Sequence, residues 1–256
     1  MNHSVILIGV GEMGGVFARG FLRAGYTVVP ARRGDDLKQL AEQHPNPALV
    51  LLAVAEKDLH AGIASIPATW KAQLALLQNE LLPSDWQQHG YDNPTVISVW
   101  FEKKPGKDAK VIQASPTFGP HAQILHDALA AIGIPAKIVS DADALLFELV
   151  LKNVYIPTTN IAGLAVGGSV GELWNQHRDL AKRVAHDVIQ IQEHLCGGTH
   201  FDAHALIDGM VAAFNGDFEH QCMGRSAPAR LQRALEIADQ ATLAVPTLRE
   251  IASANY

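Results

Sequence analysis

The sequence predicts an α/β fold, in which an N-terminal doubly wound parallel sheet is followed by a C-terminal all-α domain. Two observations predict it. Short apolar runs rich in β-branched residues alternate with amphipathic helical segments up to about residue 141. From residue 142 onward helical patterns follow one another, without strands and without a flexible linker. We therefore expect two domains, residues 1–141 and residues 142–256.

The first predicted strand, residues 4–8, leads directly into the turn Gly9-x-Gly11-x-x-Gly14. Residues 15–24 then have helical spacing, and Gly25 is placed to cap the end of that helix. In this context Gly9 permits a tight turn, Gly11 lets the backbone approach a pyrophosphate, and Gly14 lets the helix pack closely on the strand. The sequence therefore predicts a Rossmann nucleotide site, with a glycine-tolerant turn that binds nothing as the alternative. Its expected cofactor contacts are Gly9, Val10, Gly11, Glu12, Met13 and Gly14.

The end of the second predicted strand, residues 26–30, indicates which dinucleotide is bound. NAD-preferring folds place an acid there to accept from the ribose 2′-hydroxyl, whereas this chain has Ala31, Arg32 and Arg33. Guanidinium groups suit a 2′-phosphate, so we expect NADP(H), with Arg32 as the principal contact and Arg33 as the second candidate. The alternative is a solvated basic pair balanced by Asp35 and Asp36.

The remaining elements follow from periodicity and from turn residues. Residues around Trp86 are expected to form a loop, and Pro157 should kink or end the helix that contains it. Two neighbouring strands, 95–101 and 109–114, should pair antiparallel because their connection is too short for a parallel crossover. The other expected strands are 47–55, 72–77 and 136–140, and the expected helices are 36–43, 56–63, 121–132, 142–155, 171–195, 203–214 and 228–240, with a last segment opened by Pro246.

Composition narrows the class of protein. The chain has 256 residues, of which 48% are hydrophobic and 18% charged, so it is expected to be globular. Its net charge of −6 argues against nucleic acid or an anionic membrane as a partner. Cys196 and Cys222 form no CxxC motif, and the N-terminal apolar run is too short to span a bilayer, so we expect a cytoplasmic protein.

Lys152 is the candidate catalytic residue. If a nicotinamide lies at the sheet, the reaction is hydride transfer, and a carbonyl that accepts hydride needs a proton donor or cation beside its oxygen. Lys152 lies within the apolar stretch 145–156, where a lysine is rarely buried without a partner or a function. The alternative is a surface lysine whose stem lies along the helix.

The sequence resembles the ketopantoate reductase family over most of its length, most strongly over residues 1–165. The resemblance includes the glycine motif, the basic residue after the second strand, segments 76–82, 114–119 and 146–152, Asn160, and the run that begins at Gly171. It implies NADPH-dependent reduction of 2-dehydropantoate to pantoate, a step of pantothenate synthesis. It also implies that Lys152 protonates the nascent alkoxide, while Asn79 and Asn160 orient the keto acid and the nicotinamide.

The chain departs from the family pattern mainly on the substrate side. Ile156 and Val170 stand where the family usually has asparagines, and Ser226, kept here as a substrate-binding candidate, stands where it has a glutamate. We therefore expect a divergent relative that reduces another small-molecule 2-oxo acid or carbonyl compound, with ketopantoate itself as the alternative substrate. A homodimer is the candidate assembly. The alternatives are a non-catalytic NADP(H)-binding sensor or interaction protein, and a dehydrogenase of a 3-hydroxy acid.

A metal site is not expected. His200 and His204 have the i, i+4 spacing of a helical ligand pair, but no third ligand is specified and a glycine pair precedes them. Surface histidines are the preferred interpretation.

Overall fold

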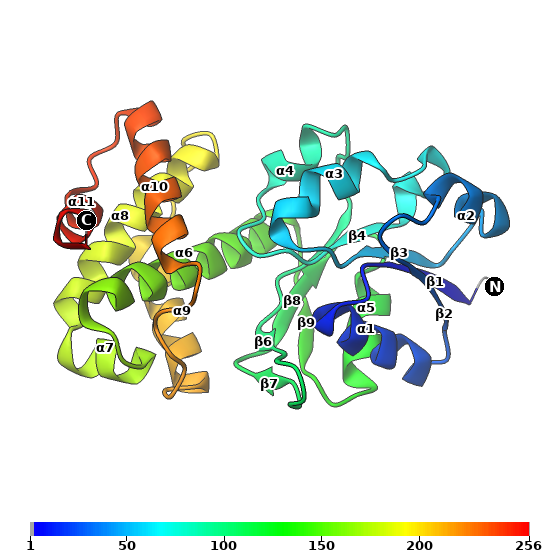
Figure 1. The fold of residues 1–256 in the computed structure, drawn as a ribbon, viewed down its shortest axis with the longest axis horizontal. Coiled ribbons are helices and arrows are strands. Elements are labelled where there is room, and N and C mark those ends of the chain that lie inside the picture. The colour runs from blue at the N-terminus through cyan, green and yellow to red at the C-terminus, as the bar shows by residue number, and fades with distance from the viewer. Residues whose placement is uncertain (1–2, 256) are drawn as a thin grey trace. The chain divides into compact units, whose positions relative to one another are not determined.

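The structure is a computed structural model that describes residues 3–255. The chain divides into two compact units, the first ending at Glu148 and the second beginning at Leu149, so the division lies within a helix. The first unit contains a seven-stranded sheet with helices, and the second is helical (Figure 1). The predicted fold class is thereby confirmed. The assignment of the units as a cofactor domain and a substrate domain stays a prediction.

The sheet of the first unit has the order β2-β1-β3-β4-β5-β8-β9. The strands β1 to β5 are parallel, β8 pairs antiparallel with β5, and β9 runs parallel to β8. This order places β1 between β2 and β3, which is the centre of a Rossmann nucleotide site. The strands are β1 (Ser4–Ile8), β2 (Thr27–Ala31), β3 (Leu49–Leu52), β4 (Leu74–Leu76), β5 (Thr95–Ile97), β8 (Ser115–Phe118) and β9 (Ala136–Ile138).

The predicted strand 95–101 is wrong as one element. Its first part is β5 in the main sheet, and its last part is β6 (Phe101–Glu102), which pairs antiparallel with β7 (Lys110–Val111) in a separate ribbon. The antiparallel pairing itself is therefore confirmed. Strand β8 was not predicted, because Ser115-Pro-Thr-Phe118 is not an apolar run and contains a proline, which is unusual inside a sheet.

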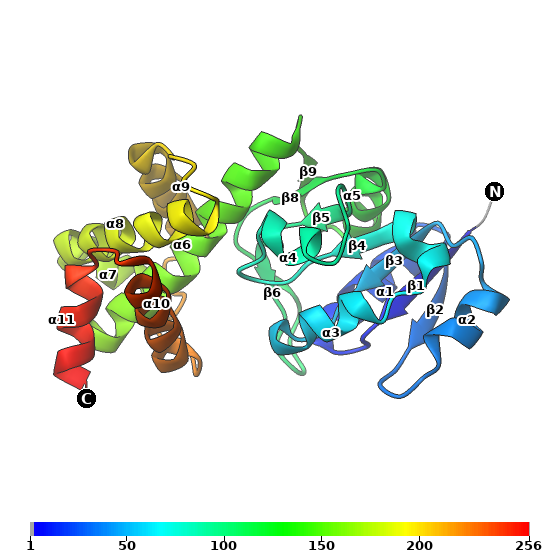
Figure 2. The same cartoon turned by 90° about the horizontal axis from the view of Figure 1, so that it is seen from above.

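Alternate side chains of β1 point to opposite faces of the sheet and meet different helices. Val5 and Leu7 face α1 (Glu12–Arg23) and α5 (Ala122–Ala130), in a core that includes Phe17 and Phe21. Gly20 lets these two helices touch, since a Cβ there would lie 2.5 Å from the carbonyl oxygen of Ala128. Helices α3 (Leu59–Ala64) and α4 (Pro83–Gln87) lie over the other face (Figures 1 and 2).

Helix α4 corrects the predicted loop around Trp86. It begins at Pro83, and the Asp85 carboxylate accepts from the backbone N–H of Leu82 at 2.7 Å, so its N-terminus is capped. Five residues are too few to show helical periodicity in a sequence. The other short elements of this unit are α2 (Leu37–Gln43) and the 3₁₀ turns η1 (Glu56–Asp58) and η2 (Ala68–Gln73).

The longest helix is α6 (Ala142–Val166), most of which belongs to the second unit and which continues through Pro157. The helix therefore does not end at Pro157, which was one of the two predicted outcomes, while the other, a kink, stays a prediction. Val154 and Ile161, on either side of it, are fully buried, and the Thr159 hydroxyl donates to the carbonyl of Tyr155 at 2.9 Å. Burial of both flanks favours a continuous helix despite the missing N–H of the proline.

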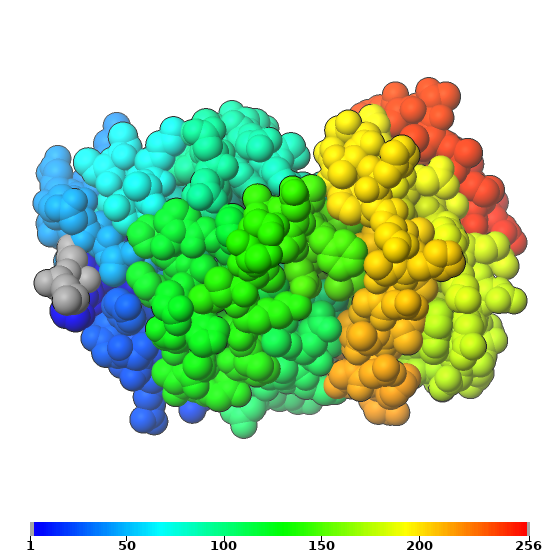
Figure 3. All heavy atoms as spheres, turned by 180° about the vertical axis from the view of Figure 1, so that it is seen from behind, coloured from blue at the N-terminus to red at the C-terminus, as the bar shows by residue number. Residues whose placement is uncertain are grey.

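The predicted helix 171–195 is two helices, which meet at His177. Helix α7 (Val170–Gln176) begins with a capping box in which Ser169 and Glu172 bond each other's backbone N–H. The other helices of the unit are α8 (Arg178–Leu195), α9 (Ala203–Gly216), α10 (Ala227–Ala241) and α11 (Pro246–Asn255). In Figure 3, α9, coloured gold, forms part of the outer surface of this unit. Within the described residues 3–255, none of the helices combines the length and the apolar character that crossing a bilayer requires.

Candidate functional site

The glycine turn has the geometry that its three glycines predict. Gly9 has a φ of +96°, and a Cβ there would lie 2.6 Å from the carbonyl oxygen of Ala53 on the neighbouring strand connection. A Cβ at Gly14 would collide with the carbonyl oxygen of Gly9, so helix α1 packs against the turn with no room for a side chain. Gly11 has open space where a Cβ would be. Close packing therefore constrains Gly9 and Gly14, while Gly11 leaves the backbone accessible.

The N-terminus of α1 presents backbone donors at this turn. Gly11 is the N-cap residue and no side chain caps it, and the first helical hydrogen bond runs from Gly15 N–H to the Gly11 carbonyl at 2.8 Å. The N–H groups of Glu12, Met13 and Gly14 thus belong to the first turn, which has no intrahelical acceptors. Together with the positive end of the helix dipole, these donors suit a phosphate.

A groove of about 1430 Å³ opens beside the turn. It is bounded by Gly9 to Gly11, by the residues that follow β2, and by the ends of β3 and α3. Arg32 and Arg33 line it as predicted, and Lys38 and Lys57 join them. Four basic side chains therefore line the groove beside the glycine turn, where an anionic group would be attracted.

The two arginines are placed differently. Arg33 Nη2 forms an ion pair with Asp58 Oδ2 at 3.2 Å, whereas Arg32 uses only its backbone N–H, donating to Asp35 Oδ2 at 2.7 Å. Within the described part of the chain, the Arg32 guanidinium makes no ion pair. Asp36 caps α2 by accepting from the N–H of Lys38 at 2.9 Å, so both acids that could balance the basic pair have local backbone partners.

Sequence reasoning missed Lys57. It lies two residues beyond Ala55, in the turn after β3, and it lines the groove only because β3 pairs directly with β1. The available signal was its position: the first cation after a buried parallel strand, at the edge where the carboxyl ends of all such strands meet.

Asn79 lies at the same edge of the sheet, after β4, and is exposed. Its neighbour Gln78 is buried and holds this edge together. Gln78 Nε2 donates to the carbonyl of Leu52 at 2.7 Å, and its Oε1 accepts from the N–H of Leu77 at 3.1 Å. Gln78, which was not predicted, therefore fixes the strand ends from which Asn79 projects.

Lys152 lies in the second unit, on α6, and is 7% exposed. Burial lowers the pKa of its ammonium from 10.5 to about 7. The adjacent Asn153 donates to Gln192 Oε1 of α8 at 3.0 Å, which fixes the rotation of α6 at this point. The alternative of a surface lysine lying along its helix is therefore excluded. An amine with this pKa can exchange a proton near neutral pH.

Asn160 lies two helical turns after Lys152 on α6, with Ile156 midway between them. Its Nδ2 donates to the carbonyl of Cys222 at 3.3 Å, and its Oδ1 accepts from Arg230 Nη1 at 3.1 Å. Arg230 on α10 was not predicted, since 70 residues separate it from Asn160 in sequence. Spacing places Lys152, Ile156 and Asn160 on one face of α6.

The two remaining substrate-side positions have different surroundings. Ser226 is exposed at the N-cap of α10, where its side chain makes no capping bond and its carbonyl accepts from the backbone N–H of Arg230 at 3.0 Å. Val170 is fully buried, and its N–H donates to the carbonyl of His220. Ser226 thus lies on the helix that carries Arg230, and Val170 is a core residue of α7.

The two cysteines and the histidine pair do not add a reactive or metal-binding group to the site. Burial raises the pKa of Cys222 and of Cys196 to about 11, so their thiolates are disfavoured at neutral pH. Over residues 3–255 no three His, Cys, Asp or Glu side chains converge as metal ligands, and His200 instead contacts Glu193 at 3.3 Å.

Comparison with known proteins identifies the fold. The sequence matches no family model and no curated protein sequence. Its structure matches a 2-dehydropantoate 2-reductase from Methylococcus capsulatus with a TM-score of 0.71 and 11% identity, over 98% of this chain and 94% of that chain. A dimeric ketopantoate reductase from Staphylococcus aureus matches with a TM-score of 0.61 and 17% identity, over 98% and 96% of the two chains. D-mandelate dehydrogenase in complex with NADH matches with a TM-score of 0.68 and 12% identity, over 98% and 96%.

These matches span nearly the whole of each chain, so the shared architecture includes both units. At such identities they show that the chain has the fold of ketopantoate reductases, in agreement with the resemblance of its motifs.

Proposed function

We propose that this protein is an NADPH-dependent reductase of a small 2-oxo acid. The observation that carries the proposal is the buried Lys152, whose pKa is lowered to about 7, on the helix where the sequence resembles the ketopantoate reductases. The fold supports it, because solved structures that share the fold are 2-oxo acid reductases and a D-mandelate dehydrogenase bound to NADH. Burial of an amine lowers the free energy of unfolding, so a lysine at this position is explained best by a role in function.

The glycine turn fits a dinucleotide. The absent Cβ atoms of Gly9 and Gly14, the accessible backbone at Gly11 and the uncapped N-terminus of α1 form a cradle for a pyrophosphate. Arg32, with Lys57 and Lys38 on the same groove, would hold the 2′-phosphate that distinguishes NADPH from NADH. In this role Arg33 is the weaker candidate, since Asp58 already engages it.

When bound, NADPH would supply a hydride to the carbonyl carbon of the keto acid. The carbonyl oxygen then becomes an alkoxide, and the Lys152 ammonium donates the proton that turns it into a hydroxyl. Lys152 is afterwards neutral and regains a proton from water. A pKa of about 7 suits this cycle, because the amine is both protonated often enough to donate and acidic enough to do so.

Asn160, Ser226 and Asn79 are the proposed substrate contacts. The Asn160 carboxamide is held between the Cys222 carbonyl and Arg230, which fixes its rotamer. Ile156 offers an apolar surface where the related family usually has an amide, so the preferred acid is expected to differ from ketopantoate in its polar groups. Should ketopantoate be the substrate, the reaction would belong to pantothenate synthesis.

A panel of 2-oxo acids tests the proposal. Oxidation of NADPH would be followed with ketopantoate, phenylglyoxylate and aliphatic 2-oxo acids, with NADH run in parallel. The proposal predicts turnover of at least one acid, with a higher kcat/KM for NADPH than for NADH. Tight NADPH binding without turnover of any acid would instead favour a non-catalytic NADP(H)-binding protein, and turnover only of 3-hydroxy acids with NADP⁺ would favour a different dehydrogenase.

The cytoplasm is the proposed compartment, since Cys196 and Cys222 are both free thiols and a reducing environment keeps them so. A homodimer is the proposed assembly, by analogy with the dimeric ketopantoate reductase of the same fold. Light scattering coupled to size-exclusion chromatography would distinguish a dimer from a monomer of 27.5 kDa.

A further inference from the structure

Glu12 is an unexpected residue at a phosphate-binding turn. It is the first residue of α1, so it adds a negative charge to the helix N-terminus whose backbone donors a pyrophosphate would use. A carboxylate at a helix N-terminus interacts favourably with the dipole, which is also the interaction a bound phosphate needs. Unless it is neutralised, Glu12 would therefore repel the cofactor from its own cradle.

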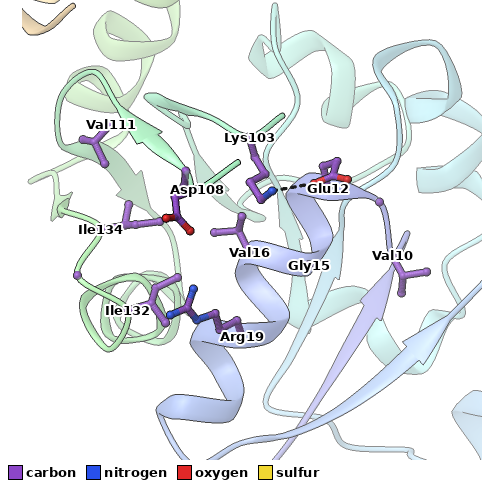
Figure 4. Close-up of a pocket in the computed structure, with 13 residues that line it drawn as sticks. Val10, Glu12, Gly15, Val16, Arg19, Lys103, Asp108, Val111, Ile132 and Ile134 are labelled. Atoms are coloured by element: carbon purple, nitrogen blue, oxygen red, sulfur yellow. Dashed lines mark ion pairs between the residues drawn. The ribbon is translucent and has the colours of Figure 1, made fainter. Parts of the chain in front are cut away.

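Lys103 provides that neutralisation in the structure. It follows β6 in the β6–β7 ribbon, and its Nζ lies 3.1 Å from Glu12 Oε2. Figure 4 shows the pair bridging the start of α1 and the ribbon. The Lys103 side chain is only 21% exposed, and its ammonium also donates to the carbonyl of Lys104 at 2.9 Å, so its position is held from two sides.

The pair lines a second cavity that adjoins the groove proposed to hold the cofactor. This cavity, of about 630 Å³, is lined by Lys103 and Glu12 together with Val16 and Arg19 of α1. Val10 and Gly11 of the glycine turn line both this cavity and the cofactor groove. Lys103 thus carries a positive charge beside the pyrophosphate cradle, although it is nearly 90 residues from the turn in sequence.

We infer that Lys103 is a positioning residue for the cofactor, which acts by neutralising Glu12 so that the N-terminus of α1 can accept the pyrophosphate. This inference rests on the proposed nucleotide site. A partly exposed ion pair contributes little to the stability of a fold, so its main consequence is expected in anion affinity. Neither residue touches the reacting atoms in this role, and the effect is electrostatic.

A double-variant cycle on NADPH binding tests the inference, with affinities measured by calorimetry on the full-length protein. Lys103→Met should weaken NADPH binding about tenfold at low ionic strength, because it leaves the Glu12 carboxylate unpaired beside the phosphates. Glu12→Gln in the same chain should restore the affinity to within about twofold of the unmodified protein. The loss in Lys103→Met should also shrink in 0.5 M salt (roughly a 4 Å screening length).

Lys104→Met is the matched control. Lys104 is the next residue, pairs with Glu102 at 3.1 Å and is 63% exposed, so its loss changes net charge equally without touching Glu12. It should bind NADPH as the unmodified protein does. In steady-state assays with an accepted 2-oxo acid, Lys103→Met should raise the KM for NADPH and leave kcat unchanged, which a structural defect would not do.

The outcomes separate the inference from the proposed function. If the unmodified protein does not bind NADPH, both are overturned. If it binds NADPH and Lys103→Met binds equally well, only the inference is overturned. A double variant as weak as Lys103→Met would also overturn it, since Lys103 would then contact the phosphates directly rather than act through Glu12.

Discussion

Among single residues, Lys152 is the one on which the proposed chemistry depends. The sequence places it in an apolar helix, and the structure adds that the side chain is buried and that its pKa falls to about 7. A folded-state pKa below the unfolded value of 10.5 means that the unfolded chain binds more protons between these pH values. Burial of the Lys152 ammonium therefore lowers the free energy of unfolding by its full amount below about pH 7. The loss becomes smaller as pH rises toward 10.5.

The lowered pKa of Lys152 gives a prediction about stability. Lys152→Met should raise the free energy of unfolding at pH 7, because it removes the burial of a charge. The difference in unfolding free energy between Lys152→Met and the unmodified protein should shrink by up to about 1.4 kcal/mol for each pH unit between 7.5 and 9.5. Over this range the buried amine of the unmodified protein loses its proton, so its burial destabilises the fold less. Urea unfolding at several pH values measures it. Lys107→Met, at an exposed position, is the control, and an advantage of Lys152→Met that stays constant with pH would contradict the prediction.

The candidate site residues that could be identified from the sequence alone are those that belong to a motif of residues close together in the chain. The glycines of the turn, Arg32 and Lys152 each lie in a local pattern that carries its own meaning. Lys57, Arg230 and Lys103 do not, because only the pairing of β3 with β1, the approach of α10 to α6 and the position of the β6–β7 ribbon give them neighbours. Long-range contacts of this kind cannot be read from spacing.

At the scale of elements, the strand–turn–helix unit β1–α1 is constrained by close backbone packing. The carbonyl of Gly9 occupies the space where Gly14 would carry a Cβ, so the turn and the helix fix each other. In helix α6, tertiary packing overrides the local sequence signal. Local propensity predicts its end at Pro157, whereas burial on both sides of the proline carries it to Val166.

The constraint on the turn can be tested with two neighbouring glycines. Gly14→Ala should lower the free energy of unfolding by about 2 kcal/mol, since the added methyl group forces α1 away from the Gly9 carbonyl. Gly15→Ala has open space for its methyl group and lies in the same helix, so it should stabilise the protein by about 0.5–1 kcal/mol. Urea denaturation of both variants measures the contrast. Equal stabilities would show that the packing at Gly14 is looser than described.

At the scale of the whole molecule, the chain divides the proposed chemistry between two units. The first unit carries the glycine turn, the basic groove and Asn79, and the second carries Lys152, Asn160 and Ser226. Alternating strands and helices made the sheet unit predictable, and uninterrupted helical periodicity did the same for the helical unit. Strand β8 was not predictable because it contains a proline and is not an apolar run, and helix α4 because five residues are too few to show helical periodicity.

The most direct test is the pH dependence of turnover in Lys152 variants, measured under saturating NADPH with the best acid of the 2-oxo acid panel. The unmodified protein should show a kcat for reduction that is constant below about pH 7 and falls tenfold per pH unit above it, because only the protonated amine donates. Lys152→Met should lose 10²–10⁴-fold in kcat (roughly the worth of a general acid) and the pH dependence with it, while still binding NADPH. A Lys152→Met variant that keeps most of its turnover, or a profile that is flat to pH 9, would contradict the account.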